Sequence, residues 1–162
     1  MTIHRRDPET VELGPLNNVV IELLQRIVPS AASDDPAVQA RLFPDPSGGQ
    51  DRELNADWKS YVEPDLRQLF QSTLETIGED LAPLEGKGSH RSRRLRLPLS
   101  HLDAWIHGLN QARLAIAARH ELTESELEEE VTVDDEERAL AILQTHFYGF
   151  LQQAFLNELG DR

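Results

Sequence analysis

The sequence of 162 residues contains no cysteine, which excludes disulfides, thiolate nucleophiles and zinc–thiolate sites. Long apolar runs are also absent, since no stretch approaches the roughly eighteen apolar residues that a membrane-spanning helix needs. The first ten residues lack the apolar segment of a secretory signal. We therefore expect a soluble, cytoplasmic protein, and the length fits a single domain over residues 1–162.

The motifs of common catalytic and nucleotide-binding sites are missing as well. The chain has no G-x-S-x-G, no phosphate loop and no G-x-G-x-x-G. Its six histidines show no metal-ligand spacing such as H-E-x-x-H. Carboxylates are abundant but clustered, whereas catalytic acids need rigid and partly buried positions. We expect a non-enzymatic protein with no catalytic residue, no cofactor and no metal.

Negative charge is concentrated in one stretch. The formal net charge is −13, and ten acidic residues with no base lie within residues 121–137. Without these ten, 19 acidic residues remain against 16 Lys and Arg, a net charge of only −3. A run of like charge is typical of a solvated segment. We predict a flexible acidic loop at 121–134, with Glu128, Glu129 and Glu130 available to a basic partner.

Positive charge gathers in a shorter stretch, where five bases and no acid lie within residues 87–96. Residues 94–99 alternate polar and apolar side chains, which predicts a half-buried strand; an extended basic loop is the alternative. Arg94 and Arg96 are therefore candidate interaction residues. Nucleic-acid binding through Arg91–Arg96 is the less favoured function, because nucleic-acid binders usually carry a net basic face.

The segment from Ser100 to His120 is predicted to be the central helix. Ser100 followed three residues later by Asp103 resembles a capping box. Apolar residues then recur at three- and four-residue steps, as on one side of a helix: Leu102, Trp105, Ile106, Leu109, Ala112 and Ile116. We expect Trp105 to lie at the centre of the core.

Two polar residues, Asn110 and Arg113, lie on or beside this apolar stripe. A guanidinium there needs a hydrogen-bonding partner to be tolerated. The favoured interpretation is a structural one, in which Asn110 and Arg113 tie the helix to a neighbouring loop or strand by hydrogen bonds. In the interaction hypothesis, Asn110, Arg113 and Gln152 organise a polar spot. The functional alternative is a small-ligand pocket or active site formed by His107, Asn110, Arg113 and His146.

The fold class is predicted to be mainly α, a compact helical bundle with a small β-sheet. The sheet combines an N-terminal hairpin with a short strand near 94–97. The other helices are expected at Gly14–Ile27 with Pro29 as the stop, at Asp35–Leu42, at Leu54–Val62 with Trp58 buried, from Pro64 to about Asp80, and at Asp135–Leu159. Apolar residues are widely distributed around the last helix, which predicts several partner helices or a homodimer.

The pattern W-x-x-x-L-N-x-x-R-L at Trp105–Leu114 resembles an uncharacterised bacterial family known mainly from actinobacteria, the domain of unknown function 2017. The resemblance extends to R-L-F-P-D at 41–45 and to F-Y-G-F-L-Q at 147–152. It implies no established activity. Genes of this family often lie beside that of the ClpS adaptor, which implies a link to regulated proteolysis by the Clp protease.

Together these observations favour a protein-interaction or regulatory module, linked through the resemblance to Clp-type proteolysis. A protein partner is expected, with no membrane, and nucleic acid is the less favoured partner. The candidate interaction residues are Asn110, Arg113, Gln152, Arg94, Arg96, Glu128, Glu129 and Glu130.

Overall fold

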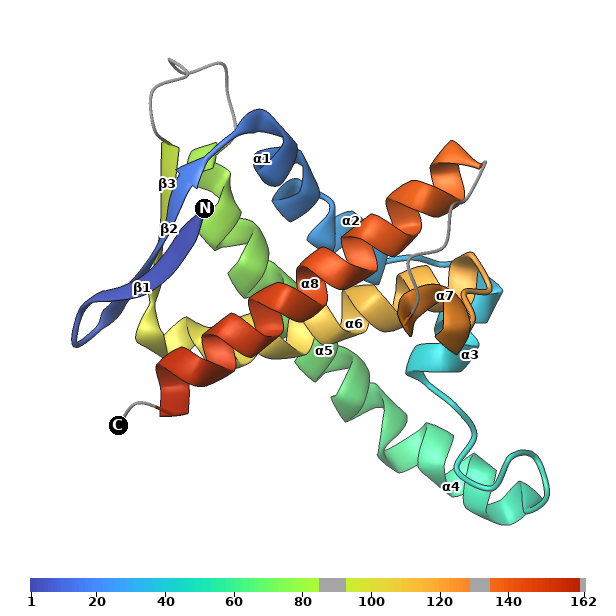
Figure 1. Cartoon of the computed structure of the whole chain (residues 1–162). Helices are drawn as coiled ribbons and strands as arrows, with labels where there is room; N and C mark the ends of the chain where they lie inside the picture. Colours follow the sequence, from blue (N-terminus) through green and yellow to red (C-terminus); the bar gives the residue numbers. More distant parts are fainter. Residues whose placement is uncertain (85–92, 129–134, 161–162) are drawn as a thin grey trace.

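The structure, a computed structural model, describes residues 1–84, 93–128 and 135–160 (Figure 1). As predicted, it is mainly α with a small antiparallel sheet. In chain order the elements are β1 (Thr2–Asp7), β2 (Thr10–Leu16), α1 (Asn18–Gln25), α2 (Ile27–Ala31), α3 (Pro36–Leu42), α4 (Arg52–Tyr61), α5 (Glu63–Leu81), β3 (Arg93–Pro98), α6 (Leu102–Arg119), α7 (Glu124–Glu128) and α8 (Glu136–Gly160).

Helix α6 is the centre of the fold, as the sequence predicted. It packs against α2, α3, α5 and α8. Trp105 is fully buried, and its indole N–H donates to Asp80 Oδ2 of α5 over 2.9 Å. The Trp105 ring meets the ring of Phe155 from α8 edge-on, with centroids 5.8 Å apart. One side chain therefore joins three helices.

The predicted start of α6 is wrong. Leu99–His101 forms a 3-10 turn, so Ser100 lies inside that turn rather than at the N-cap. The helix begins at Leu102 without a side-chain cap. Asp80 instead contacts this entrance, with its Oδ2 atom 3.0 Å from His101 Nδ1. The Asp80 carboxylate thus accepts the indole N–H of Trp105 and also contacts His101, the residue before α6.

The sheet has the order β1-β2-β3, with both pairs antiparallel, which confirms the third strand predicted near 94–97. Figure 1 shows it at one end of the helical bundle. Its inner face carries the alternating apolar residues, all buried: Val11, Leu13, Leu95 and Leu97. Arg5 of β1 donates through Nη2 to the carbonyl of Glu158 near the end of α8. The first strand and the last helix are thereby in contact.

The first predicted helix is wrong at both ends. Pro15 belongs to β2, and α1 begins only at Asn18, with Asn17 Oδ1 accepting the N–H of Val20 as the cap. The helix ends at Gln25, four residues before Pro29. Pro29 lies in the first turn of α2, where a missing N–H costs no hydrogen bond. Pro29 therefore lies near the start of a second helix and does not end the first one.

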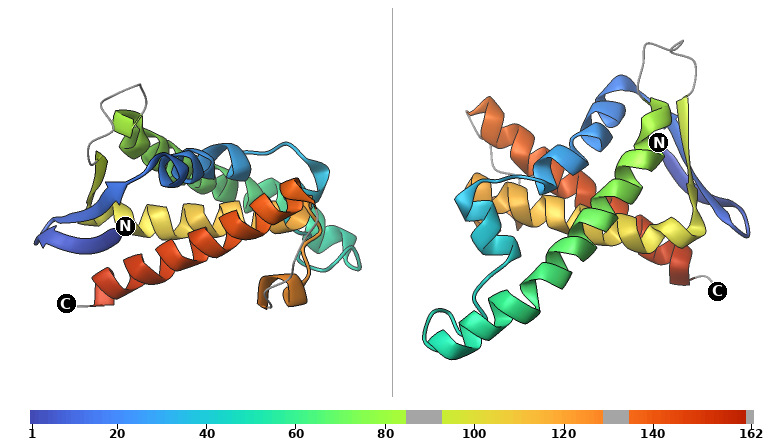
Figure 2. Two further views of the ribbon diagram at one scale, coloured as in Figure 1. Left: turned by 45° about the horizontal axis from the view of Figure 1, so that its top comes forward. Right: turned by 180° about the vertical axis from the view of Figure 1, so that it is seen from behind.

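Helix α4 and the beginning of α5 project from the body of the protein (Figures 1 and 2). Asp51 caps α4 by accepting the N–H of Leu54. Contrary to expectation, no residue of α4 is fully buried; Trp58 is only half-buried, and Tyr61 is 76 % exposed. The helix is therefore stabilised by its N-terminal cap and by its contacts with α5 rather than by packing in the core.

Helix α8 crosses α6 and covers the other side of the core (Figure 2). The hydroxyl of Tyr148 donates to the carbonyl of Leu23 over 2.8 Å, and burial raises the pKa of Tyr148 to about 12. The opposite side of α8 exposes Leu143, Phe150 and Leu156, so homodimerisation through this side stays a prediction. Among the described residues, no helix combines the length and the apolar character needed to cross a membrane.

Candidate functional site

The structure brings Arg113 and Gln152 together at the crossing of α6 and α8. Arg113 Nη1 donates to Gln152 Oε1 over 2.6 Å, and Gln152 Nε2 donates to the carbonyl of Ile106 over 2.9 Å. The guanidinium lies along Gly149, where an added Cβ would be 3.4 Å from Arg113 Cζ. Arg113 thus ties α6 to a second helix, whereas a loop or strand was the expected partner.

The other members of the predicted pocket lie elsewhere. Asn110 and His107 are exposed and line a small hollow of about 170 Å³ between α5 and α6. His146 is also exposed, and its Nε2 donates to the carbonyl of Leu127 over 2.9 Å. Residues three apart are offset by about 60° around a helix. This offset lets Arg113 face α8 while Asn110 faces α5, so the four residues do not form one site.

The outer face of the sheet carries a cluster that the sequence indicated only in part. Glu12 of β2 is 6 % exposed although it is charged. Its Oε1 accepts from Arg94 Nη1 over 2.6 Å, and its Oε2 accepts from Arg96 Nε over 3.1 Å. Arg6 of β1 places Nη1 3.5 Å from the same Oε2. We call Arg6, Arg94 and Arg96 around Glu12 the arginine cluster.

The charges of the arginine cluster do not cancel. Hydrogen bonds from Arg94 and Arg96 hold the pKa of Glu12 below its ordinary value, so the carboxylate stays ionised at neutral pH. Three guanidinium groups against one carboxylate leave two positive charges in excess. The three arginine side chains are 44–58 % exposed, so part of this excess faces solvent.

Strand register explains why Arg6 and Glu12 were missed. Glu12 pairs with His4 of β1 on one side and with Arg96 of β3 on the other. The alternation of side chains along each strand puts these residues on the outer face. Both hairpin strands were predicted, so aligning them would have placed Arg6 and Glu12 near Arg94. Of the other three bases of the predicted basic stretch, Arg93 begins β3, whereas Lys87 and Arg91 lie outside the described residues.

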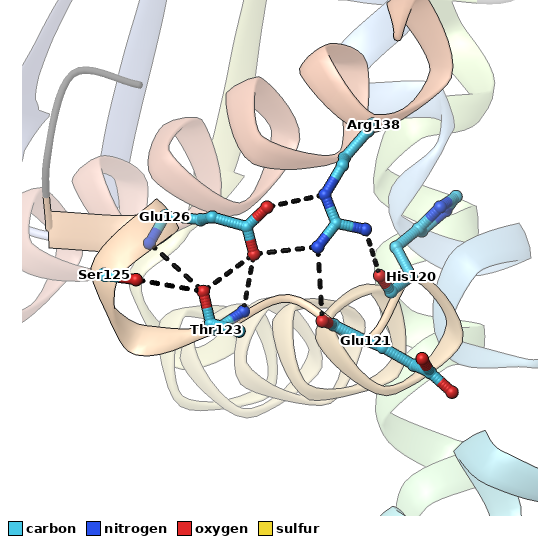
Figure 3. Close-up of polar contacts among 6 residues, drawn as sticks. All are labelled: His120, Glu121, Thr123, Ser125, Glu126 and Arg138. Atoms are coloured by element: carbon cyan, nitrogen blue, oxygen red, sulfur yellow. Dashed lines mark hydrogen bonds and ion pairs between the residues drawn. The ribbon is translucent and has the colours of Figure 1, made fainter. Parts of the chain in front are cut away.

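Part of the acidic segment is attached to the body through α7 (Figure 3). A capped turn begins it, because Thr123 N donates to Glu126 Oε2 over 2.9 Å and Glu126 N donates to Thr123 Oγ1 over 3.4 Å. Of the candidate glutamates, Glu128 contributes the last residue of α7, whereas Glu129 and Glu130 lie outside the described residues.

Arg138 of α8 fastens this turn to the end of α6. Its Nε donates to Glu126 Oε1 over 2.6 Å, and its Nη2 donates to Glu126 Oε2 over 2.8 Å. Its Nη1 donates to the carbonyl of His120 over 2.7 Å (Figure 3). The hydrogen bonds from Arg138 and Thr123 lower the pKa of Glu126 to about 2. The Glu126–Arg138 pair therefore sets the position of α7.

The attachment of α7 is expected to depend on pH in a defined window. Because folding lowers the pKa of Glu126, its contribution is complete above the ordinary value of 4.5 and is lost as the pH falls through about 2. The amide of Thr123, which donates to Glu126, should keep its NMR chemical shift from about pH 6 to about pH 3.

Glu126→Gln should displace the Thr123 amide signal at every pH, because the amide loses its carboxylate acceptor. The matched control is Glu124→Gln, since Glu124 is an exposed residue of the same short helix. That variant should leave the Thr123 signal unchanged. A Thr123 amide that titrates with a midpoint near 4.5 in the wild type would contradict the Glu126–Arg138 attachment.

Within the residues that the structure describes, no group of three or more His, Asp and Glu side chains could hold a metal ion. The family model described as Domain of unknown function (DUF2017) matches the chain over residues 4–159. No curated protein and no solved structure matches it.

Proposed function

We propose that this chain, which belongs to the DUF2017 family, is a non-enzymatic protein-interaction module that binds an acidic segment of a partner protein. The observation that carries the proposal is the arginine cluster, where two positive charges are exposed on a chain whose net charge is −13. Carboxylates are the natural ligands of exposed guanidinium groups, because the planar group can donate two parallel hydrogen bonds.

The arginine cluster is prepared for such binding. Arg94 and Arg96 each give Glu12 one hydrogen bond and retain further N–H groups that face solvent. Glu12 holds both side chains in place, which reduces the entropy lost when a ligand binds. Nucleic-acid binders usually carry a broad, net basic face, whereas a short carboxylate-bearing segment can pair with the arginine cluster alone, so we favour a protein partner.

We infer further that the partner belongs to Clp-type proteolysis in the cytoplasm. This inference depends on the family resemblance alone, through the association with the ClpS adaptor. Purified ClpS and Clp protease subunits are therefore the first proteins to test against the full chain.

Binding of a blocked tetraglutamate peptide, measured by fluorescence anisotropy, tests the arginine cluster directly. Replacing Arg94 and Arg96 together by glutamine keeps an N–H donor for Glu12 and removes two charges. We expect affinity to fall about tenfold or more, because charge-assisted hydrogen bonds are the strong ones. Glu12→Gln removes the opposing charge and should tighten binding.

The matched control replaces Arg41 and Arg52, two exposed arginines of α3 and α4, by glutamine. It changes the net charge equally and should alter affinity by no more than about twofold. Equal losses in both double variants would show an unspecific charge effect and contradict the proposal. Tighter binding of a single-stranded DNA oligonucleotide than of the peptide would replace it with nucleic-acid binding.

A further inference from the structure

An apolar groove lies on a different part of the protein from the arginine cluster. Its volume is about 630 Å³, within the range of typical ligand sites. Helix α5 forms one wall and α2 and α3 form the other, with apolar residues that include Val28, Ala31, Leu42, Phe70 and Leu74. The groove is bordered by surface helices, so a ligand can enter from solvent.

One buried polar side chain reaches this groove without a partner. Gln111 of α6 is only 4 % exposed, and its side-chain amide makes no hydrogen bond to any residue that the structure describes. It lines both the groove and the small hollow beside Asn110. With 4 % of the residue exposed and no partner among the described residues, the amide depends on water that reaches it through the groove. A ligand in the groove would supply the missing donor and acceptor.

The positive charge beside the groove is already paired. Arg67 of α5 lies 3.8 Å over the ring of Phe43, and its Nη2 is 2.7 Å from Glu63 Oε1. Its Nη1 donates to Gln39 Oε1 over 2.8 Å. Glu75, the remaining charged residue of the lining, accepts a hydrogen bond from Gln71. The lining therefore offers no uncompensated cation to an anionic ligand such as a fatty acid.

The groove continues past Arg67 into a second hollow. This hollow has a volume of about 480 Å³ and shares Gln39, Phe43 and Arg67 with the groove. It is lined further by Pro44 and Gly49 of the loop after α3. Two hollows in a row along α5 suit an elongated ligand better than a compact one.

We propose that this groove binds an extended, uncharged peptide segment with large apolar side chains. The apolar side chains lie between α5 and the pair α2 and α3, and a backbone N–H and C=O of the peptide pair with the Gln111 amide. A helical peptide has used its backbone groups internally and has none for Gln111. An acyl chain has no hydrogen-bonding group along its length. Of these three ligands, an extended peptide satisfies both the apolar walls and the buried amide.

A blocked pentapeptide, with leucine, phenylalanine and leucine between two glycines, is the probe. NMR titration of the ¹⁵N-labelled full chain should shift the Gln111 side-chain amide signals. The same peptide with its central amides N-methylated keeps the apolar groups but loses backbone donors. We expect it to bind about tenfold more weakly. Decanoate, the acyl-chain probe, should not displace the pentapeptide.

Two variants separate the apolar walls from the amide. Gly78 lines the groove, and no atom lies within 4 Å of the position of an added Cβ, so Gly78→Phe can fill the groove without entering the core. It should abolish binding, whereas Gln68→Phe, at an exposed position of the same helix, should not. Gln111→Leu should remove the preference for the unmethylated peptide, leaving both peptides within about twofold.

Three results would overturn the proposal. The first is that the Gln111 side-chain signals do not shift at millimolar peptide. The second is that Gly78→Phe binds the peptide as tightly as the wild type. The third is that decanoate displaces the peptide while Gln111→Leu still prefers the unmethylated peptide. The double glutamine variant at Arg94 and Arg96 should bind the pentapeptide normally. Failure at the groove is therefore distinguishable from failure at the arginine cluster.

Discussion

Replacing Trp105 by alanine is expected to lower the free energy of unfolding by about 3–5 kcal/mol, the usual effect of removing a large aromatic residue from a core. The indole is fully buried and contacts the Phe155 ring. Its removal leaves a cavity between α6 and α8. It also takes away the N–H that Asp80 accepts, so a largely buried carboxylate keeps only its contact with His101.

Urea unfolding followed by circular dichroism measures this effect. The chain supplies its own control in its second tryptophan, Trp58, which is only half-buried on the projecting α4. Trp58→Ala removes the same side chain and should cost about 1 kcal/mol. If both variants lose equal stability, Trp105 does not occupy the centre of the core.

Replacing Gly108 by alanine is expected to destabilise the protein by about 1–3 kcal/mol, the usual effect of overpacking a core. Gly108 is buried where α6 crosses α5. An added Cβ would come closer to Ile77 Cδ1 than van der Waals contact allows and would lie 3.3 Å from Thr73 Cγ2. Ile77 is fully buried, so its side chain has little room to move away.

The matched control is Gly78→Ala in α5, where an added Cβ meets no atom within 4 Å. Alanine favours a helix over glycine by about 1 kcal/mol, so this variant should gain stability by up to that amount. Thermal unfolding of both variants provides the measurement. A stabilised Gly108→Ala variant would show that α5 and α6 are not in close contact at this crossing.

Periodic features of the fold could be predicted from the sequence, because each depends on local spacing. The apolar stripe through Trp105 indicated α6 and its burial, and the alternation at residues 94–97 indicated β3. Helix boundaries were less predictable, because the residues at Gly14–Pro15 and at Ser100 are each compatible with two local structures. A proline suits both the start of a helix and a sheet strand beside a turn, and a serine suits both a cap and a 3-10 turn.

A candidate site could be predicted only where a single residue, by its own chemistry and position in the sequence, required a polar partner. Arg113 needed a polar partner on any model of the fold, and Gln152 is that partner. The arginine cluster depends on strand register, which joins Glu12 to residues more than eighty positions away in the chain. Gln111 looks like an ordinary polar helix residue in the sequence. Its burial is set by the positions of α2, α3 and α5, which the sequence pattern does not specify.

The position of α8 after α6 in chain order has a consequence for biosynthesis. Synthesis proceeds from the N-terminus, so the sheet and α1–α6 are complete before the 25 residues of α8. Until then Trp105 lacks the Phe155 ring, and Leu23 lacks the Tyr148 hydroxyl. The nascent protein therefore exposes apolar surface of α6 until α8 has left the ribosome. Premature termination before Glu136 would yield an aggregation-prone fragment.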